Sequence, residues 1–210
     1  MLGQFIDWLQ IAWNLFNQST ARILWNLFLA FIPLILSFYL FRPQIKRHLF
    51  WWILLLIFIA FLPNAPYILT DSIHIIELSQ QDYPLWSLVL VLIPQYILFI
   101  LLGFGAYAVS LIQLERYLAS FLTPRYLTLV RAIAHTLSVV GIYIGRFERF
   151  NSWDFVTKPV LVILTTIKDL LEIDQFLSMA IAWLTIWLLS ELVREVNKKF
   201  LAHNLISDAE

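Results

Sequence analysis

Cysteine is absent from this 210-residue chain, and only 13% of its residues are charged. The lack of cysteine excludes disulfides, thiolate catalysis and cysteine-bound zinc or iron–sulfur centres. Soluble domains carry a charge on about a quarter of their residues, so a chain that is 61% hydrophobic and so poorly charged lies outside that class. Fourteen basic residues balance fourteen acidic ones, which gives no reason to expect nucleic-acid binding. We therefore interpret the chain as an integral membrane protein.

Motifs that would identify a reaction are also missing. No glycine-rich phosphate loop, complete set of metal ligands or nucleophile motif stands clear of the background. The sequence thus predicts no cofactor and no metal, and it does not identify the molecule on which the protein acts.

Long apolar runs predict the fold, because about 20 helical residues cross a hydrocarbon layer of roughly 30 Å. The chain has room for about five such helices and no second soluble domain, which predicts one all-α, polytopic membrane helix bundle over residues 1–210. The predicted spans are residues 23–41, 43–62, 86–112, 127–147 and 176–193. Residues 4–18, 66–79 and 159–171 are predicted to be interfacial helices, the last of them interfacial or re-entrant because it is too short to cross.

The distribution of basic residues predicts the orientation, since cytoplasmic loops are rich in lysine and arginine. These residues gather after the first span, around the third loop and in the C-terminal tail: Arg42, Lys46, Arg47, Arg116, Arg125, Arg194, Lys198 and Lys199. The loop between the second and third spans carries only acidic groups. We therefore predict a protein of the cell membrane with a cytoplasmic C-terminus and an external N-terminus. The loop after the fourth span is then external although it is basic.

A first polar cluster follows directly on the second span. At about 100° per residue, its polar side chains share one face of a helix: Tyr67, Thr70, Asp71, His74 and Glu77. One interpretation is that Asp71 orients or charges His74 as a general base, and another is that the two residues supply ligands to a metal. Two ligands at this spacing are a weak signal for a metal. In the alternative, Asn64 or Thr70 caps a turn and the other side chains face water.

A second polar cluster ends the fourth span. It spaces three side chains three residues apart and adds polar groups beyond them: Tyr143, Arg146, Arg149, Asn151, Ser152 and Asp154. Arginine suits planar carboxylates and phosphates, so these residues could hold an anionic lipid headgroup or a phosphorylated substrate. Alternatively, an arginine pairs with a carboxylate of the first cluster and clamps two external segments together. In either case we expect the two clusters to meet, because unpaired charges near lipid are costly.

Within the spans, Gln95 and His135 require an explanation. The simpler expectation is that each makes an interhelical hydrogen bond, and the alternative for His135 is a polar path or the binding of haem or quinone. Arg131 is expected to extend its charged end towards the cytoplasmic surface.

Three stretches of the chain together resemble a known family: Trp25-Asn26-Leu27-Phe28-Leu29-Ala30, Phe61-Leu62-Pro63-Asn64-Ala65-Pro66-Tyr67 and Asn151-Ser152-Trp153-Asp154. In this order they resemble the bacterial membrane-protein family called domain of unknown function 1361. The resemblance implies a multi-span bacterial membrane protein and no particular activity. It also implies that Asn26 belongs with the two polar clusters. The chain departs from the family at the start of the third span, where Ser87 follows Trp86 in place of an aspartate.

Two classes of function follow from these observations. In the first, the protein is an enzyme at the external membrane face that acts on a lipid-linked or envelope substrate, with His74 and Asp71 as catalytic residues. The residues predicted to bind the substrate or an anion are Asn64, Tyr67, Thr70, Tyr143, Arg146, Arg149, Asn151 and Asp154. In the second, the protein is a structural or assembly subunit or a small transporter. The expected partners are membrane lipids and a lipid-linked or anionic small molecule.

Overall fold

The computed structural model describes residues 2–43, 45–150 and 154–207, and these residues form helices joined by short turns. The helices are α1 (Leu2–Leu40), α2 (Leu49–Phe61), α3 (Asn64–Tyr67), η1 (Ile68–Ser72), α4 (Ile73–Ser79), α5 (Leu85–Ser87), η2 (Leu88–Leu92), α6 (Ile93–Leu118), α7 (Pro124–Arg146), α8 (Asp154–Thr157), α9 (Pro159–Leu171) and α10 (Ile173–Ser207). The described residues contain no strand, so the predicted all-α fold is confirmed.

Five helical segments are long and apolar enough to cross a membrane: Gly3–Leu40, Leu49–Ser79, Leu85–Leu118, Pro124–Arg146 and Ile173–Phe200. They correspond in order to the five predicted spans, which confirms the polytopic helix bundle. The predicted short helix at residues 159–171 is α9, and α10 follows it after a single residue.

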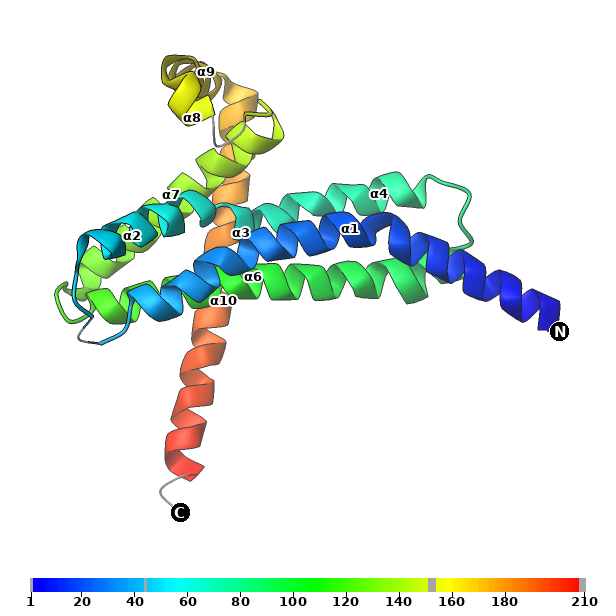
Figure 1. Cartoon of the computed structure of the whole chain (residues 1–210), viewed down its shortest axis with the longest axis horizontal. Helices are drawn as coiled ribbons and strands as arrows, with labels where there is room; N and C mark the ends of the chain where they lie inside the picture. The colour runs from blue at the N-terminus through cyan, green and yellow to red at the C-terminus, as the bar shows by residue number, and fades with distance from the viewer. Residues whose placement is uncertain (1, 44, 151–153, 208–210) are drawn as a thin grey trace.

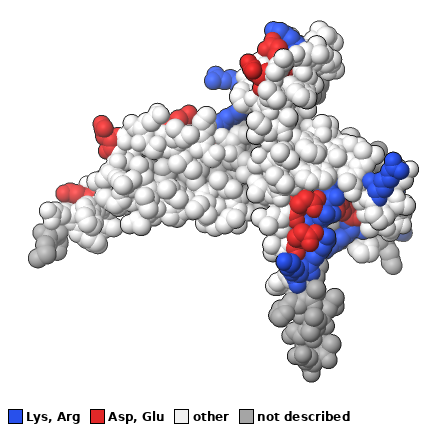
Figure 2. Space-filling model, turned by 180° about the vertical axis from the view of Figure 1, so that it is seen from behind, with Lys and Arg blue, Asp and Glu red and all other residues white. Residues whose placement is uncertain are grey.

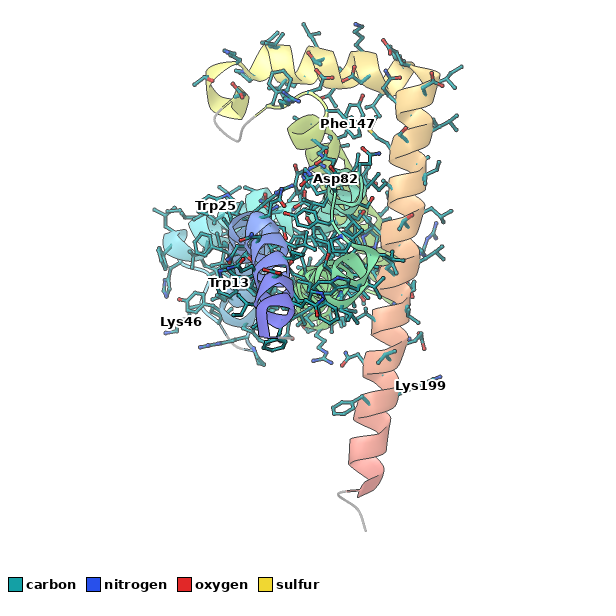
Figure 3. All side chains as sticks on the ribbon, turned by 90° about the vertical axis from the view of Figure 1, so that its right-hand side faces the viewer. Trp13, Trp25, Lys46, Asp82, Phe147 and Lys199 are labelled. Carbon is teal, nitrogen blue, oxygen red and sulfur yellow. The ribbon has the colours of Figure 1, made fainter. Side chains whose placement is uncertain are left out.

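The first three spans lie side by side and alternate in direction (Figure 1). The loops at residues 41–48 and 119–123 lie together at one end of this layer, and the loop at residues 80–84 lies at the other end with the N-terminus (Figure 1). The fourth span, α7, runs obliquely to the layer, and α10 crosses the layer and contacts both α6 and α7. Figure 3 looks along the layer and shows α10 passing beside it, with Lys199 near one end of that helix.

The predicted interfacial helix at residues 4–18 is not a separate element, because α1 continues from Leu2 to Leu40. No proline or glycine interrupts residues 4–32. Leu15, Ser19 and Ile23, one turn apart, are all buried on the face of α1 that packs against the third span. At 1.5 Å per residue the 39 residues of α1 are about 58 Å long, well above the roughly 30 Å of a hydrocarbon layer.

The second span also differs from the prediction at both ends. It begins at Leu49 instead of residue 43, because the intervening basic residues are not helical. At its other end Pro63 and Pro66 do not stop it, and α2 is followed by α3, η1 and α4 in one continuous path (Figure 1). Pro63 is the N-cap residue just before α3 and Pro66 lies in its first turn, where backbone N–H groups have no partner within the helix. The predicted surface helix at residues 66–79 is therefore the continuation of this span.

Two glycines allow the neighbouring spans to approach this continuation closely. A Cβ atom at Gly103 of α6 would lie 1.9 Å from Cδ1 of Ile68, and one at Gly141 of α7 would lie 2.8 Å from Cβ of Pro63. Ile68 and the nearby Ala65 are fully buried as a result. The polar segment from Asn64 to His74 is thus held between α6 and α7 and is not spread over a surface.

Candidate functional site

Asp71 is the centre of a polar site between three helical segments. Its carboxylate lies on η1 and is 1% exposed. The Nη1 atom of Arg146, the last residue of α7, donates a hydrogen bond to Asp71 Oδ1 at 3.0 Å. Asn26 of α1 donates through Nδ2 to the other carboxylate oxygen. The expected meeting of the two polar clusters is confirmed at this ion pair, and Asn26 joins them as the family resemblance implied.

Arg146 also holds the backbone and side chains that surround Asp71. Its Nη1 atom donates to the hydroxyl of Tyr67 at 3.2 Å, and Nη2 donates to the carbonyl oxygen of Thr70 at 3.3 Å. The guanidinium carbon lies 5.6 Å from the centre of the Tyr67 ring, within reach of a cation–π interaction. Because a buried carboxylate needs a paired charge and further hydrogen bonds, these contacts compensate for the burial of Asp71.

His74 lies one turn beyond Asp71 and makes its hydrogen bond to a different carboxylate. Its Nδ1 atom is 2.5 Å from Oε2 of Glu77, whereas Nε2 is 3.9 Å from Oδ1 of Asp71, which is too long for a hydrogen bond. The His74 side chain is 19% exposed, and that of Glu77 is 60% exposed. Glu77 thus holds one ring nitrogen of His74, and Asp71 lies at ion-pair distance from the other. That Asp71 orients or charges His74 stays a prediction.

Other predicted residues of the first cluster are satisfied locally. The Asn64 amide donates to the carbonyl oxygen of Phe61 at 3.2 Å, and the Thr70 hydroxyl donates to that of Tyr67 at 2.7 Å. Thr70 contributes to the site through its backbone carbonyl, which accepts from Arg146. The predicted roles of the Asn64 and Thr70 side chains in binding stay predictions.

The second cluster is only partly brought to the site. Tyr143 is buried and stacks on Phe147, with 5.0 Å between the ring centres. Because α7 ends at Arg146, the spacing of three residues does not extend to Arg149, which is exposed with a φ angle of 54°. In the part of the chain that the structure describes, no hydrogen bond or ion pair joins Arg149 to Asp71 or Glu77. Asn151 lies outside the described residues, and Asp154 is the first residue of α8.

A cavity of about 610 Å³ lies beside the ion pair, between α1, the second span and α7. Asn26, Asn64 and Tyr67 line it together with the backbone of Gly145. Two of these residues, Asn26 and Tyr67, also contact Asp71 or Arg146, so the cavity and the ion pair share side chains. The remaining lining residues are mostly apolar side chains of the spans.

The two polar side chains predicted to bond between spans do so. Gln95 of α6 accepts from Ser19 at 3.0 Å and donates to Thr20 at 3.1 Å, both on α1. His135 of α7 is fully buried, with its two ring nitrogens 2.7 Å from the Tyr107 hydroxyl and 3.1 Å from the Ser190 hydroxyl. The simpler expectation for both residues is therefore confirmed.

A charge network near the basic loops was missed by the sequence analysis. Arg131 does not extend to the surface but is 6% exposed and lies 2.5 Å from Glu191 of α10 and 3.6 Å from Glu115 of α6. Arg194 lies 2.5 Å from Glu191 and 3.8 Å from Glu115, which completes a network of two arginines and two glutamates. Figure 2 shows acidic and basic side chains gathered in one group above the C-terminal part of the chain, on a face that is mostly uncharged. The sequence feature that could have predicted this network is the presence of glutamates inside apolar runs, because charges within a membrane protein are paired.

No group of three or more histidine, aspartate or glutamate side chains is arranged to hold a metal ion within the described residues. At the Asp71 site the two ring nitrogens of His74 face two different carboxylates. The site thus offers hydrogen bonding and proton transfer through an oriented imidazole.

The apolar spans and the paired charges between them define a multi-pass helical membrane protein. The chain belongs to the family described as "Protein of unknown function (DUF1361)", whose model matches residues 25–190. The matched range includes Asn26, Asp71 and Arg146. Comparison with curated proteins and with solved structures gives no match.

Proposed function

We propose that the protein is an enzyme that binds the polar headgroup of a lipid-linked or envelope molecule beside the Asp71–Arg146 ion pair, with His74 as the general base. The observation that carries this proposal is the gap of 3.9 Å between His74 Nε2 and Asp71 Oδ1. When Nδ1–H donates to Glu77, Nε2 carries a lone pair and faces a second acceptor. A water molecule has a proton for each of these two acceptors and would give one of them to Nε2 as its oxygen attacks the substrate.

The environment of Asp71 supports this assignment. Arg146 and Asn26 hold the carboxylate from two other helices, so its position relative to His74 is fixed. An imidazole that one carboxylate orients and a second one faces matches the arrangement by which enzymes activate a hydroxyl or water nucleophile. A structural clamp explains the Asp71–Arg146 pair equally well, but it gives no role to the half-buried imidazole.

His74→Gln is expected to abolish function while the abundance and melting temperature of the protein change little. Glutamine keeps much of the volume and hydrogen bonding of histidine but takes up no proton near neutral pH. The measurement is complementation of a deletion strain, with western blotting and thermal unfolding of the purified variant. His48→Gln, the same change at an exposed position before α2, is the control and should complement fully. Full complementation by His74→Gln would remove the general base from the proposal.

We further propose that the N-terminus and the Asp71 site face the outside of the cell membrane. The basic loops lie together at the opposite end of the layer, as expected for a cytoplasmic face (Figure 1). With cysteine introduced into this cysteine-free chain, Ser79→Cys should react with an impermeant maleimide in intact cells, and Ser120→Cys should react only after permeabilisation. Both serines are exposed. The reverse pattern would invert the orientation.

A further inference from the structure

We propose that the substrate is an amphiphile with a single apolar chain in the cavity beside Asp71 and an uncharged, hydroxyl-bearing headgroup at the polar end of that cavity. This inference rests on the proposed function and names its substrate class. A volume of about 610 Å³ lies within the range of roughly 300–1,000 Å³ that is usual for small-molecule sites.

The polarity of the cavity changes along its length. Because the second span and α7 both run from the basic end of the bundle towards Asp71, their residue numbers give position along the cavity. The early positions are apolar, with Ile59 and Ala60 on α2 and Leu137 and Val140 on α7. The late positions on the second span, Asn64 and Tyr67, are polar, whereas α7 contributes Ile144 and Gly145 at that end.

The first span shows the same change in polarity. It runs towards the basic end, so its earlier residues lie at the polar end of the cavity. Leu29 lies towards the basic end of α1, and Asn26, one turn earlier, lies at the polar end. The first and second spans therefore agree on which end of the cavity is polar, while α7 lines it with apolar residues and glycines throughout. A chain in the apolar part would place its headgroup beside the residues that hold Asp71.

The apolar part of the cavity opens on the side of the bundle. Ile59 and Leu137 at its edge are 44% and 53% exposed, so in a membrane they face lipid. Gly145 is exposed at the polar end, and a Cβ atom there would meet nothing within 4 Å. An amphiphile can thus enter sideways from the bilayer without carrying its headgroup through the hydrocarbon layer.

The charges next to the polar end disfavour an anionic headgroup. Arg146 is paired with Asp71 at 3.0 Å, and Arg22 is a second arginine close enough to act on Glu77. Glu77, bound to His74, adds a second carboxylate. A phosphate would have to compete with Asp71 for Arg146, and this competition would add to the cost of removing its water.

The free hydrogen-bonding atoms at the polar end indicate what the headgroup supplies. The amide nitrogens of Asn26 and Asn64 donate one hydrogen bond each, to Asp71 and to the carbonyl oxygen of Phe61, which leaves one N–H and the amide oxygen of each side chain for a ligand. The Tyr67 oxygen accepts from Arg146 and keeps its own proton to donate. Because these groups both donate and accept, they suit a hydroxyl headgroup, which does the same.

Photolabelling of the full-length protein in membranes tests the inference. Two probes share one diazirine-bearing alkyl chain and differ in their heads, one a long-chain alcohol and the other the corresponding alkyl phosphate. The alcohol is expected to label peptides from residues 59–67 or 137–145 in the unmodified protein. Gly145→Leu, which fills the cavity from its open position, should reduce this labelling about tenfold, the equivalent of about 1.4 kcal/mol in affinity.

Gly105→Leu is the matched control, because a Cβ at Gly105 also meets nothing within 4 Å but this glycine does not line the cavity. The control should label like the unmodified protein, and both variants should be equally abundant, since leucine favours a helix more than glycine does. If the Gly145→Leu protein is labelled as strongly as the unmodified protein, the apolar chain does not bind in this cavity. If the alkyl phosphate labels the protein more strongly than the alcohol, the proposal that the headgroup is uncharged is wrong.

The outcomes separate this inference from the general base. In one outcome His74→Gln fails to complement, while Gly145→Leu complements and is labelled like the unmodified protein. This result would support the proposed function and reject the amphiphile as the substrate. In the other outcome Gly145→Leu loses labelling and His74→Gln complements fully. This result would support amphiphile binding and reject His74 as a general base.

Discussion

Arg146→Ala is expected to lower the free energy of unfolding by about 3–5 kcal/mol, the cost of leaving a buried charge without its partner. The stranded charge is Asp71, which is 1% exposed and would keep only the hydrogen bond from Asn26. The variant also loses the two bonds that Arg146 makes to Tyr67 and Thr70. Unfolding of the purified protein in mixed micelles, followed by loss of helical circular dichroism, provides the measurement.

Arg149→Ala is the control for this measurement. It also removes an arginine side chain, but from an exposed position three residues further along the chain. A change within about 0.5 kcal/mol is expected there. In the double variant Asp71→Ala with Arg146→Ala, part of the lost stability should return because no charge is left unpaired. Equal effects of Arg146→Ala and Arg149→Ala would show that the ion pair contributes nothing to the fold.

Arg131→Ala is expected to cost about 3 kcal/mol or more, because it leaves two glutamates facing each other beside α10. Glu115 and Glu191 are 17% and 25% exposed, and Arg194 would remain as their single arginine partner. The variant also loses the cation–π contact to Trp187, whose ring centre is 5.1 Å from the guanidinium carbon.

The same unfolding assay applies to Arg131→Ala, with limited proteolysis between α9 and α10 to detect release of the last helix. Arg125→Ala, an exposed position in the first turn of α7, is the control and should leave both readouts unchanged. Arg131→Lys should recover part of the stability, since lysine keeps the charge but lacks the planar fork that reaches two carboxylates. A stable Arg131→Ala protein with α10 still protected would contradict a role for the network in holding that helix.

The predicted spans agree best with the structure where the apolar run within one helix is enough to define its ends. The fourth span was predicted at residues 127–147 and is helical at Pro124–Arg146, and the short helix at residues 159–171 is α9. Apolar length is a local property, so it can be read without knowledge of neighbouring helices. The prediction was wrong at Pro63 and Pro66, where burial of Ala65 and Ile68 against α6 favours the continuing helix.

The candidate site was predicted in part. The sequence placed Asp71 and Arg146 together because opposite charges at the edge of a membrane need partners, and the distance of 3.0 Å confirms this. It did not distinguish Arg146 from Arg149, because that choice depends on where α7 ends. It also did not show that Glu77, three residues after His74, makes the shorter contact with the imidazole, because that depends on the side-chain conformation of His74.

By itself the sequence determined that this is an all-α membrane protein with five apolar spans, because hydropathy and helical period are properties of consecutive residues. Only the tertiary structure decided which polar groups meet. Asn26 is 45 residues from Asp71, and Arg131 is 60 residues from Glu191, so no local pattern records either contact. The cavity beside Asp71 is likewise formed by three separate helices, and its size depends on how closely glycines allow them to pack.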